Sequence, residues 1–220
     1  MRNRFDKQLT EMNHELMSMA MLVESSISMA VAAMQQNDAE LAKNIILKDD
    51  EIDHKEREIE RMCFMLLLSQ QPVAGDLRSI STVLKMLTDL ERIGDHASDI
   101  SEITVMNADK ALELPEYIPQ MAETAGLMVR NAIDAFIQKD LVKARSVIRN
   151  DDIVDDLFLA LRNELIDSIR TRGNTLDGEQ TLDMLMVGKY FERIGDHAVN
   201  IAEWVVFDIT GRHKDDTVAG

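Results

Sequence analysis

A seven-residue segment, Glu-Arg-Ile-Gly-Asp-His-Ala, occurs twice in this 220-residue chain, at residues 91–97 and 192–198. The repeat is wider than the segment. Aspartates at positions 38, 49, 50 and 53 have counterparts at 140, 151, 152 and 155, a displacement of 102 residues (140 − 38 = 102). The segment itself is displaced by 101 residues (192 − 91 = 101). Identities of this length are not expected by chance, so one structural unit occurs twice.

Apolar residues recur at steps of three and four, which predicts amphipathic helices. With three prolines and nine glycines, the composition favours long helices over turn-rich β structure. Helices are expected to begin near Phe5, after Asp38, near Leu77, near Ile118, after Asp140 and near Leu182. The predicted fold is all-α, with two tandem, pseudo-symmetric three-helix bundles and six long helices.

The best domain boundary is the segment from Ala108 to Pro119, which contains two prolines. We therefore expect a first bundle at residues 1–110, a second at 111–210 and a frayed tail at 211–220.

Charge and cysteine content limit the classes of function. A net charge of −16 disfavours nucleic-acid binding. Cys63 is the only cysteine, which fits a reducing cytosol, and Met1–Lys7 has no apolar signal-peptide core. The longest fully apolar run, Met62–Leu68, is far shorter than the roughly 20 residues that span a bilayer. We expect a soluble, cytoplasmic protein without membrane insertion, while peripheral docking on a membrane complex stays open.

The repeated segment carries oxygen-bearing side chains at i, i+4 and i+8, a spacing that puts them on one helix face. A second acidic row precedes each copy. Carboxylates from two neighbouring antiparallel helices can share a hard or borderline cation such as Mg, Mn, Fe or Zn. The candidate ligands are Asp49, Asp53, Glu91, Asp95 and Asp99 in the first half, and Asp151, Asp155, Glu192, Asp196 and Asn200 in the second.

Two other interpretations of these acids remain open: a solvated acidic face, and ion pairing with Arg92 and Arg193. The change from Asp99 to Asn200 removes one charge from the second site, so metal number or affinity can differ between the halves.

Gly94 and Gly195 stand inside predicted helices, where glycine costs about 1 kcal/mol relative to alanine. Either a close helix approach or room for a ligand explains them. His96 and His197 lie about 100° around the helix from the acids, so they are weaker ligand candidates, placed behind the ligands or facing solvent.

Common enzyme signatures are absent from the sequence. It contains no GxxxxGK[ST] or GxGxxG phosphate loop and no HExxH. The motif order Glu-x-x-x-Asp-His differs from the Glu-x-x-His of di-iron bundles.

Together, the doubled Glu-Arg-Ile-Gly-Asp-His-Ala segment, the paired Asp-x-x-x-Asp segments and residues 71–78, Gln-Pro-Val-Ala-Gly-Asp-Leu-Arg, resemble the PhoU family. The resemblance covers almost the whole chain. It implies a cytoplasmic, all-helical, dimeric protein that carries metal ions or clusters on (Asp/Glu)-x-x-x-Asp motifs and is not an enzyme.

The resemblance also implies partners and a role. Such proteins are negative regulators of the phosphate-starvation (Pho) response, and they connect the ATPase subunit of the Pst phosphate ABC transporter to the PhoR sensor kinase. The alternative from another class is a helical metal-dependent hydrolase or oxidase that uses the carboxylate sites. A third possibility is a structural helical scaffold without metal.

Overall fold

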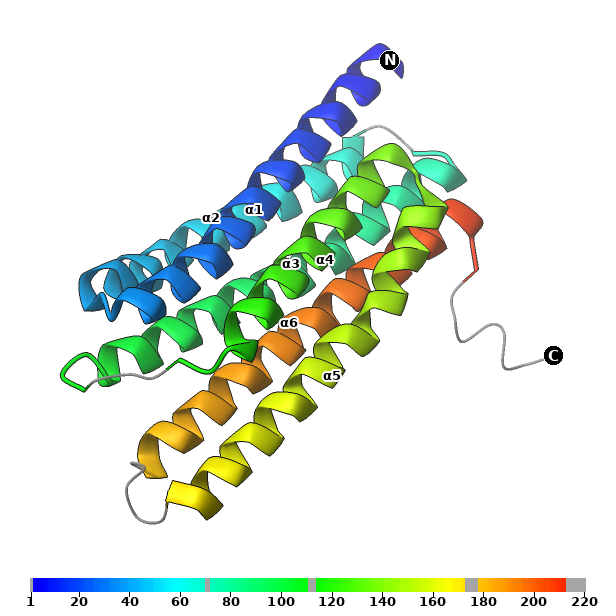
Figure 1. Ribbon diagram of the computed structural model, residues 1–220. Helices are drawn as coiled ribbons and strands as arrows, with labels where there is room; N and C mark the ends of the chain where they lie inside the picture. The colour runs from blue at the N-terminus through cyan, green and yellow to red at the C-terminus, as the bar shows by residue number, and fades with distance from the viewer. Residues whose placement is uncertain (1, 70–71, 111–113, 173–177, 213–220) are drawn as a thin grey trace.

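The computed structural model describes residues 2–69, 72–110, 114–172 and 178–212, and within these residues it contains six helices and no strand. The all-α prediction is therefore confirmed. The helices are α1 Arg2–Gln36, α2 Ala39–Ser69, α3 Ala74–Met106, α4 Tyr117–Gln138, α5 Leu141–Arg172 and α6 Gly178–Thr210 (Figure 1).

Tight turns join the first two helices of each half, and they are built alike. Asn37 and Lys139 both adopt a left-handed conformation, with φ of 50° and 53°. Each precedes an aspartate that caps the next helix. Asp38 Oδ1 accepts hydrogen bonds from the backbone amides of Glu40 and Leu41, and Asp140 Oδ1 accepts them from the amides of Val142 and Lys143. The N-caps predicted at these two aspartates are confirmed.

Each half is a bundle in which the three helices pack side by side. In the first half α1, α2 and α3 contact one another, and in the second half α4, α5 and α6 do so (Figure 1). The halves meet where α3 packs against α6 and α1 against α4. The helices α2 and α5 lie outside this central contact, and each packs against the helices of its own half.

One hydrophobic cluster runs through both halves. It includes four residues of α2 that are spaced by seven in the sequence, and all of these are at most 2% exposed: Ile45, Ile52, Ile59 and Leu66. The cluster continues across the contact between the halves, with buried residues contributed by all six helices.

The residues near which α3 and α6 are expected to begin, Leu77 and Leu182, lie outside the core. Leu77 is 47% exposed and Leu182 is 64% exposed, so neither belongs to the core. The buried face of α3 starts at Ile80, and that of α6 at Thr181 and Met184. Periodicity alone could not fix the register at these helix ends, because the first turn of each helix has few packing neighbours.

By length and composition alone, one described helix, α1, could cross a membrane, with a mean hydropathy of 1.6 in its most apolar window. Half of that window is buried inside the protein, and the core helix of a soluble protein meets the same criterion. Packing against the other helices therefore accounts for the buried half of that window.

Candidate metal sites

The two acidic rows of each half approach each other at the glycine of the repeated segment. A Cβ atom added to Gly94 on α3 would lie 3.4 Å from Asp49 Oδ1 on α2. A Cβ added to Gly195 on α6 would lie 3.5 Å from Asp151 Oδ1 on α5. Each motif glycine therefore lies beside a carboxylate of the neighbouring helix, at matching positions and at distances of ordinary van der Waals contact.

Gly94 also marks a close approach of apolar side chains. Its added Cβ would lie 3.0 and 3.2 Å from the Cδ1 and Cγ2 atoms of Ile52. At Gly195 the corresponding neighbour is Val154, at 3.6 Å, which is ordinary van der Waals contact. The close helix approach is observed at Gly94, whereas room for a ligand beside it stays a prediction.

The carboxylates that face these glycines are electrostatically unfavourable in their charged form. The pKa of Asp49 is raised to about 6, chiefly by burial and then by repulsion from the charges of Asp95 and Asp53. Burial also raises the pKa of Asp151 to about 6, with added repulsion from Asp155 and Asp196. A cation placed between the two rows would relieve this repulsion in either half.

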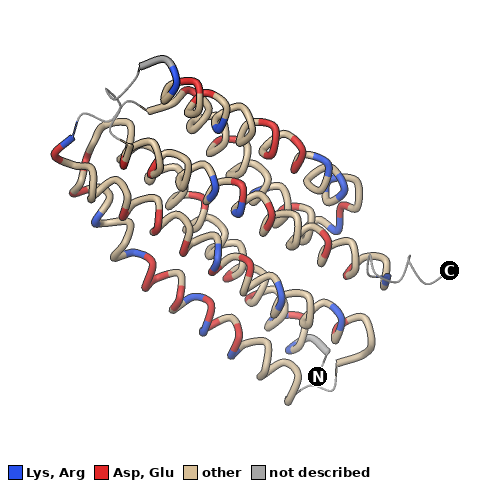
Figure 2. Tube along the Cα trace, turned by 90° about the horizontal axis from the view of Figure 1, so that it is seen from below, with Lys and Arg blue, Asp and Glu red and all other residues tan. Residues whose placement is uncertain are grey.

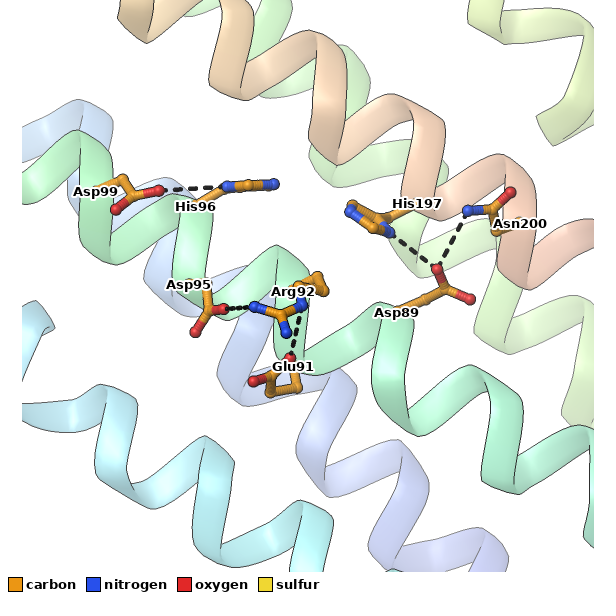
Figure 3. Close-up of polar contacts among 8 residues, drawn as sticks. All are labelled: Asp89, Glu91, Arg92, Asp95, His96, Asp99, His197 and Asn200. Carbon is orange, nitrogen blue, oxygen red and sulfur yellow. Dashed lines mark hydrogen bonds and ion pairs between the residues drawn. The ribbon is translucent and has the colours of Figure 1, made fainter.

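Arginine side chains lie against the acids of the first half. Arg92 Nη1 is 2.8 Å from Asp95 Oδ2, and its Nε is 3.4 Å from Glu91 Oε2, so the guanidinium lies between the two carboxylates (Figure 3). On α2, Arg57 Nη2 is 2.9 Å from Asp53 Oδ2.

The second half uses a different cation. Lys189, one turn before the repeated segment on α6, forms an ion pair with Glu192. Its Nζ also lies 5.6 Å from the centre of the Phe158 ring on α5. Phe158 occupies the position that Glu56 occupies in the first half (158 − 56 = 102), so an aromatic ring replaces a carboxylate there.

In the part of the chain that the structure describes, no three His, Cys, Asp or Glu side chains converge closely enough to hold a metal ion as they stand. The donor set nevertheless fits a hard cation, because acids of two packed helices lie close enough in each half to repel one another. An ion that binds Glu91 Oε2 or Asp95 Oδ2 would have to displace Arg92 from that oxygen. The ten ligand assignments therefore stay predictions.

The structure gives Asn200 a different contact from the one predicted. Its Nδ2 atom donates a hydrogen bond to Asp89 Oδ1 on α3, at 3.2 Å. His197 Nδ1 lies 2.9 Å from the same oxygen, so two residues of α6 meet one carboxylate of the other half (Figure 3).

The matching residues of the other copy make a related contact. Tyr190 occupies the position of Asp89 (190 − 89 = 101), and its ring centre is 5.4 Å from that of His96. His96 Nδ1 lies 3.4 Å from Asp99 Oδ2, and the two histidine rings are 5.7 Å apart. His96 is only 7% exposed, so it faces the other half of the protein and not solvent.

Sequence reasoning missed three residues around these sites: Glu56, Asp89 and Tyr190. Glu56 could have been found, because it follows Asp49 by seven residues on the same face of α2. Asp89 and Tyr190 lack such a signal, because they differ between the copies and their partners lie about a hundred residues away.

Cys63 is removed from any surface chemistry. Its side chain is fully buried, with Sγ 3.4 Å from Met12 Sδ, and burial raises the pKa of its thiol to about 12. A thiolate nucleophile is therefore not available at this position.

Comparison with known proteins gives a consistent result over nearly the full chain. The PhoU domain matches twice, at residues 16–104 and 118–205, one match in each half. The phosphate-specific transport system accessory protein PhoU homolog of Clostridium acetobutylicum is 38% identical over 216 residues, which is 97% of this chain and 98% of that protein.

Solved structures agree with the fold. The crystal structure of PhoU from Pseudomonas aeruginosa superposes with a TM-score of 0.88 at 32% identity, covering 94% of this chain and 100% of that one. The phosphate transport system regulatory protein PhoU from Streptococcus pneumoniae gives a TM-score of 0.86 at 29% identity, covering 94% and 98%.

Proposed function

Because this chain belongs to the PhoU family, we propose that it is a metal-binding regulatory accessory protein of a phosphate-specific transport system. The regulatory role is supported by relatives that are named as accessory or regulatory proteins of phosphate transport. In this proposal the protein restrains the phosphate-starvation response when phosphate is plentiful.

The partners follow from the same premise. We propose that the protein binds the ATPase subunit of the Pst transporter and a PhoR-type sensor kinase. It would act in the cytoplasm as a homodimer and dock on these membrane complexes without inserting. Figure 2 shows Asp and Glu spread over the helices among fewer Lys and Arg, in line with 40 acidic and 24 basic residues. A surface of this charge suits basic partner surfaces.

The metal part of the proposal is supported above all by one observation. In both halves, a carboxylate of the second helix faces the motif glycine of the third helix, and its pKa is raised to about 6. Asp49, Asp53, Glu91 and Asp95 would hold the ion in the first half, and Asp151, Asp155, Glu192 and Asp196 in the second, with Asp99 and Asn200 as additional candidates. A bound divalent ion supplies the positive charge that these acids lack.

Thermal denaturation of the full chain tests the metal sites. Chelation should lower the melting temperature, and Mn, Fe, Zn or Mg should restore it. A ligand that binds only the folded state adds about 2.7 kcal/mol at a hundredfold excess over Kd. The Asp49→Asn/Glu91→Gln variant should be more stable than wild type without metal and should lose the response of its first half.

A matched control is Asp50→Asn, which removes an exposed acid beside Asp49. It should keep the wild-type response. If chelator and every divalent ion leave wild-type melting unchanged, and the Asn/Gln variant melts lower, the acids serve as ion-pair partners and the metal proposal fails.

Deletion of the gene tests the regulatory role. Phosphate-starvation genes should stay active in rich phosphate when the protein is missing, and wild-type protein should restore repression. Normal repression in the deletion strain would contradict the proposal. Restoration by the Asp49→Asn/Glu91→Gln variant would separate the regulatory role from the first metal site.

We propose that the protein is not an enzyme, which accords with the buried, protonated Cys63 and with relatives named as accessory proteins. The hydrolase or oxidase alternative has a direct test. Turnover of a phosphate ester or of dioxygen by metal-loaded protein, lost in Glu91→Gln, would favour it.

A further inference from the structure

The acids of the first half have a cation of their own chain in contact with them. Arg92 contacts both Glu91 and Asp95, two of the four proposed ligands on α2 and α3. The side chains of Glu91 and Asp95 are 20% and 31% exposed, and that of Arg92 is 55% exposed. The carboxylates therefore lie partly in the helix contact, while the guanidinium covers them from the solvent side.

The equivalent arginine of the second half is arranged differently. For the described residues, no ion pair joins Arg193 to Glu192 or Asp196, and Lys189 contacts Glu192 instead. Arg193 lies near the contact between the halves. Burial lowers the pKa of His96 and raises that of Tyr190, and the charge of Arg193 acts on both groups.

A metal ion and the Arg92 guanidinium cannot use the same carboxylate oxygens together. Arg92 contacts one oxygen of each carboxylate, Glu91 Oε2 and Asp95 Oδ2, so these oxygens must leave Arg92 before an ion can bind them. The positive charge of Arg92 would also repel a divalent ion that lies within a few ångströms of it.

We propose that Arg92 is a tethered counterion that competes with the metal ion in the first half, and that Lys189 plays this part in the second. This inference rests on the proposed metal sites. It implies that the two sites differ in affinity for a structural reason, since one cation bridges two ligands and the other contacts one. It also implies that metal binding frees the Arg92 guanidinium at the protein surface.

An affinity measurement tests the competition. A full-length background variant, Asp151→Asn/Glu192→Gln, leaves only the first site, and its fold is verified by circular dichroism. Mn²⁺ is titrated calorimetrically into the chelator-treated protein with and without Arg92→Gln. Because the arginine pairs are partly exposed, we expect Arg92→Gln to tighten binding by roughly threefold to tenfold.

Arg193→Gln is the matched control, because it removes the same charge from the same position of the other copy. It should leave the first-site affinity unchanged. In the reciprocal background, Asp49→Asn/Glu91→Gln, the change Lys189→Gln should tighten the second site.

A spectroscopic measurement on the otherwise wild-type chain does not depend on these backgrounds. The side-chain Nε–H resonance of Arg92, assigned by comparison with Arg92→Gln, is followed by ¹⁵N NMR as Mg²⁺ is added. It should move toward the position of a free arginine as the site fills, while the Arg193 resonance should not move in this way.

The outcomes separate the two proposals. If wild type binds Mn²⁺ but Arg92→Gln binds with unchanged or weaker affinity, or if the Arg92 resonance stays fixed on saturation, Arg92 is not a competitor and only this inference fails. If wild type binds neither Mn²⁺ nor Mg²⁺, the proposed metal function fails and this inference fails with it.

Discussion

Asn200 and Asp89 show how single residues join the halves. Asn200 donates a hydrogen bond to Asp89, and His197 contacts the same carboxylate oxygen. The two copies differ at Asp99 and its counterpart Asn200. They also differ at Asp89, which Asn200 faces, and its counterpart Tyr190. An amide can donate to Asp89 where a carboxylate would repel it.

This pairing predicts the effect of Asn200→Asp. The new carboxylate would lie beside Asp89, so we expect a loss of about 1–2 kcal/mol in unfolding free energy at pH 7.5 without metal. Urea denaturation measures the loss, and adding Asp89→Asn should restore most of it. An unchanged stability combined with tighter metal binding in the second half would show that residue 200 belongs to the metal site instead.

The raised pKa values of Asp49 and Asp151 predict a pH dependence. Each carboxyl has an ordinary pKa of 3.8 and a folded-state pKa of about 6. Between these values the folded protein binds more protons than the unfolded chain, so stability falls as pH rises through about 6.

Replacing Asp49 by Asn removes this dependence at one site. In chelator, the difference in unfolding free energy between Asp49→Asn and wild type should grow by about 1 kcal/mol in favour of the variant as pH rises from 4.5 to 7.5, allowing for solvent screening. Chemical denaturation at the two pH values measures the gain. Asp50→Asn should show no such gain, and a gain of equal size there would assign the effect to general surface charge.

At the scale of helices, the contact between the second and third helix is tighter in the first half. A Cβ on Gly94 would lie 3.0 Å from Ile52 Cδ1, whereas a Cβ on Gly195 would lie 3.5–3.6 Å from the nearest side-chain atoms. Alanine is favoured over glycine inside helices by about 1 kcal/mol. The two glycines should therefore respond differently to the same substitution.

We expect Gly195→Ala to be neutral or stabilising, and Gly94→Ala to be about 1–2 kcal/mol less favourable than Gly195→Ala. Thermal denaturation in chelator measures both. The additional change Ile52→Val should relieve the contact at Gly94 and bring the two variants closer together. Equal effects of both alanines without this change would mean that α2 and α3 can move apart at little cost.

The turn between α4 and α5 depends on Lys139. Its left-handed conformation is unfavourable for a side chain other than glycine or asparagine. Its ammonium group pairs with Asp208 of α6, whose side chain is only 4% exposed. The ion pair ties the turn to the end of α6.

Replacing Lys139 by Met would leave Asp208 buried without this cation, so we expect a loss of about 2–3 kcal/mol at pH 7.5. Lys143→Met is the control, since Lys143 lies 3.7 Å from the 32% exposed Asp134 and should cost at most about 1 kcal/mol. Adding Asp208→Asn to Lys139→Met should recover stability. Equal losses in the two lysine variants would contradict the role of Asp208.

At the scale of the whole molecule, the two halves share one core. Buried residues of all six helices belong to a single cluster, and polar contacts such as Asn107 Nδ2 to Asp183 Oδ2, at 2.8 Å, join α3 to α6. Asp89 of α3 faces Asn200 of α6, whereas Asn107 faces Asp183, so the two helices run antiparallel. The repeated units are therefore related by an approximate two-fold arrangement.

A shared core predicts a single cooperative unfolding transition in differential scanning calorimetry, with equal calorimetric and van't Hoff enthalpies. In chelator, the buried substitution Leu90→Ala should lower that one transition without splitting it. Two separate transitions, with only one shifted by Leu90→Ala, would show that residues 1–110 and 111–210 unfold as independent domains.

The sequence alone determined the helices and their repeat. Apolar spacing is a local property of the chain, so the six helices, the caps at Asp38 and Asp140 and the heptad face of α2 follow from it. The position of Asp49 opposite Gly94 could also be inferred from the sequence, because two helices that a short loop joins pack side by side and each of these helices has one acidic face.

Only the tertiary structure decided which polar side chains meet. The inter-half contacts of Asp89 with His197 and Asn200, and of His96 with Tyr190, join residues about a hundred positions apart with no shared period. Arg92 and Arg193 stand in identical seven-residue segments, yet among the described residues only Arg92 lies between its neighbouring acids. Long side chains choose among rotamers according to the charges and volumes that packing places around them, and a periodic pattern does not contain that information.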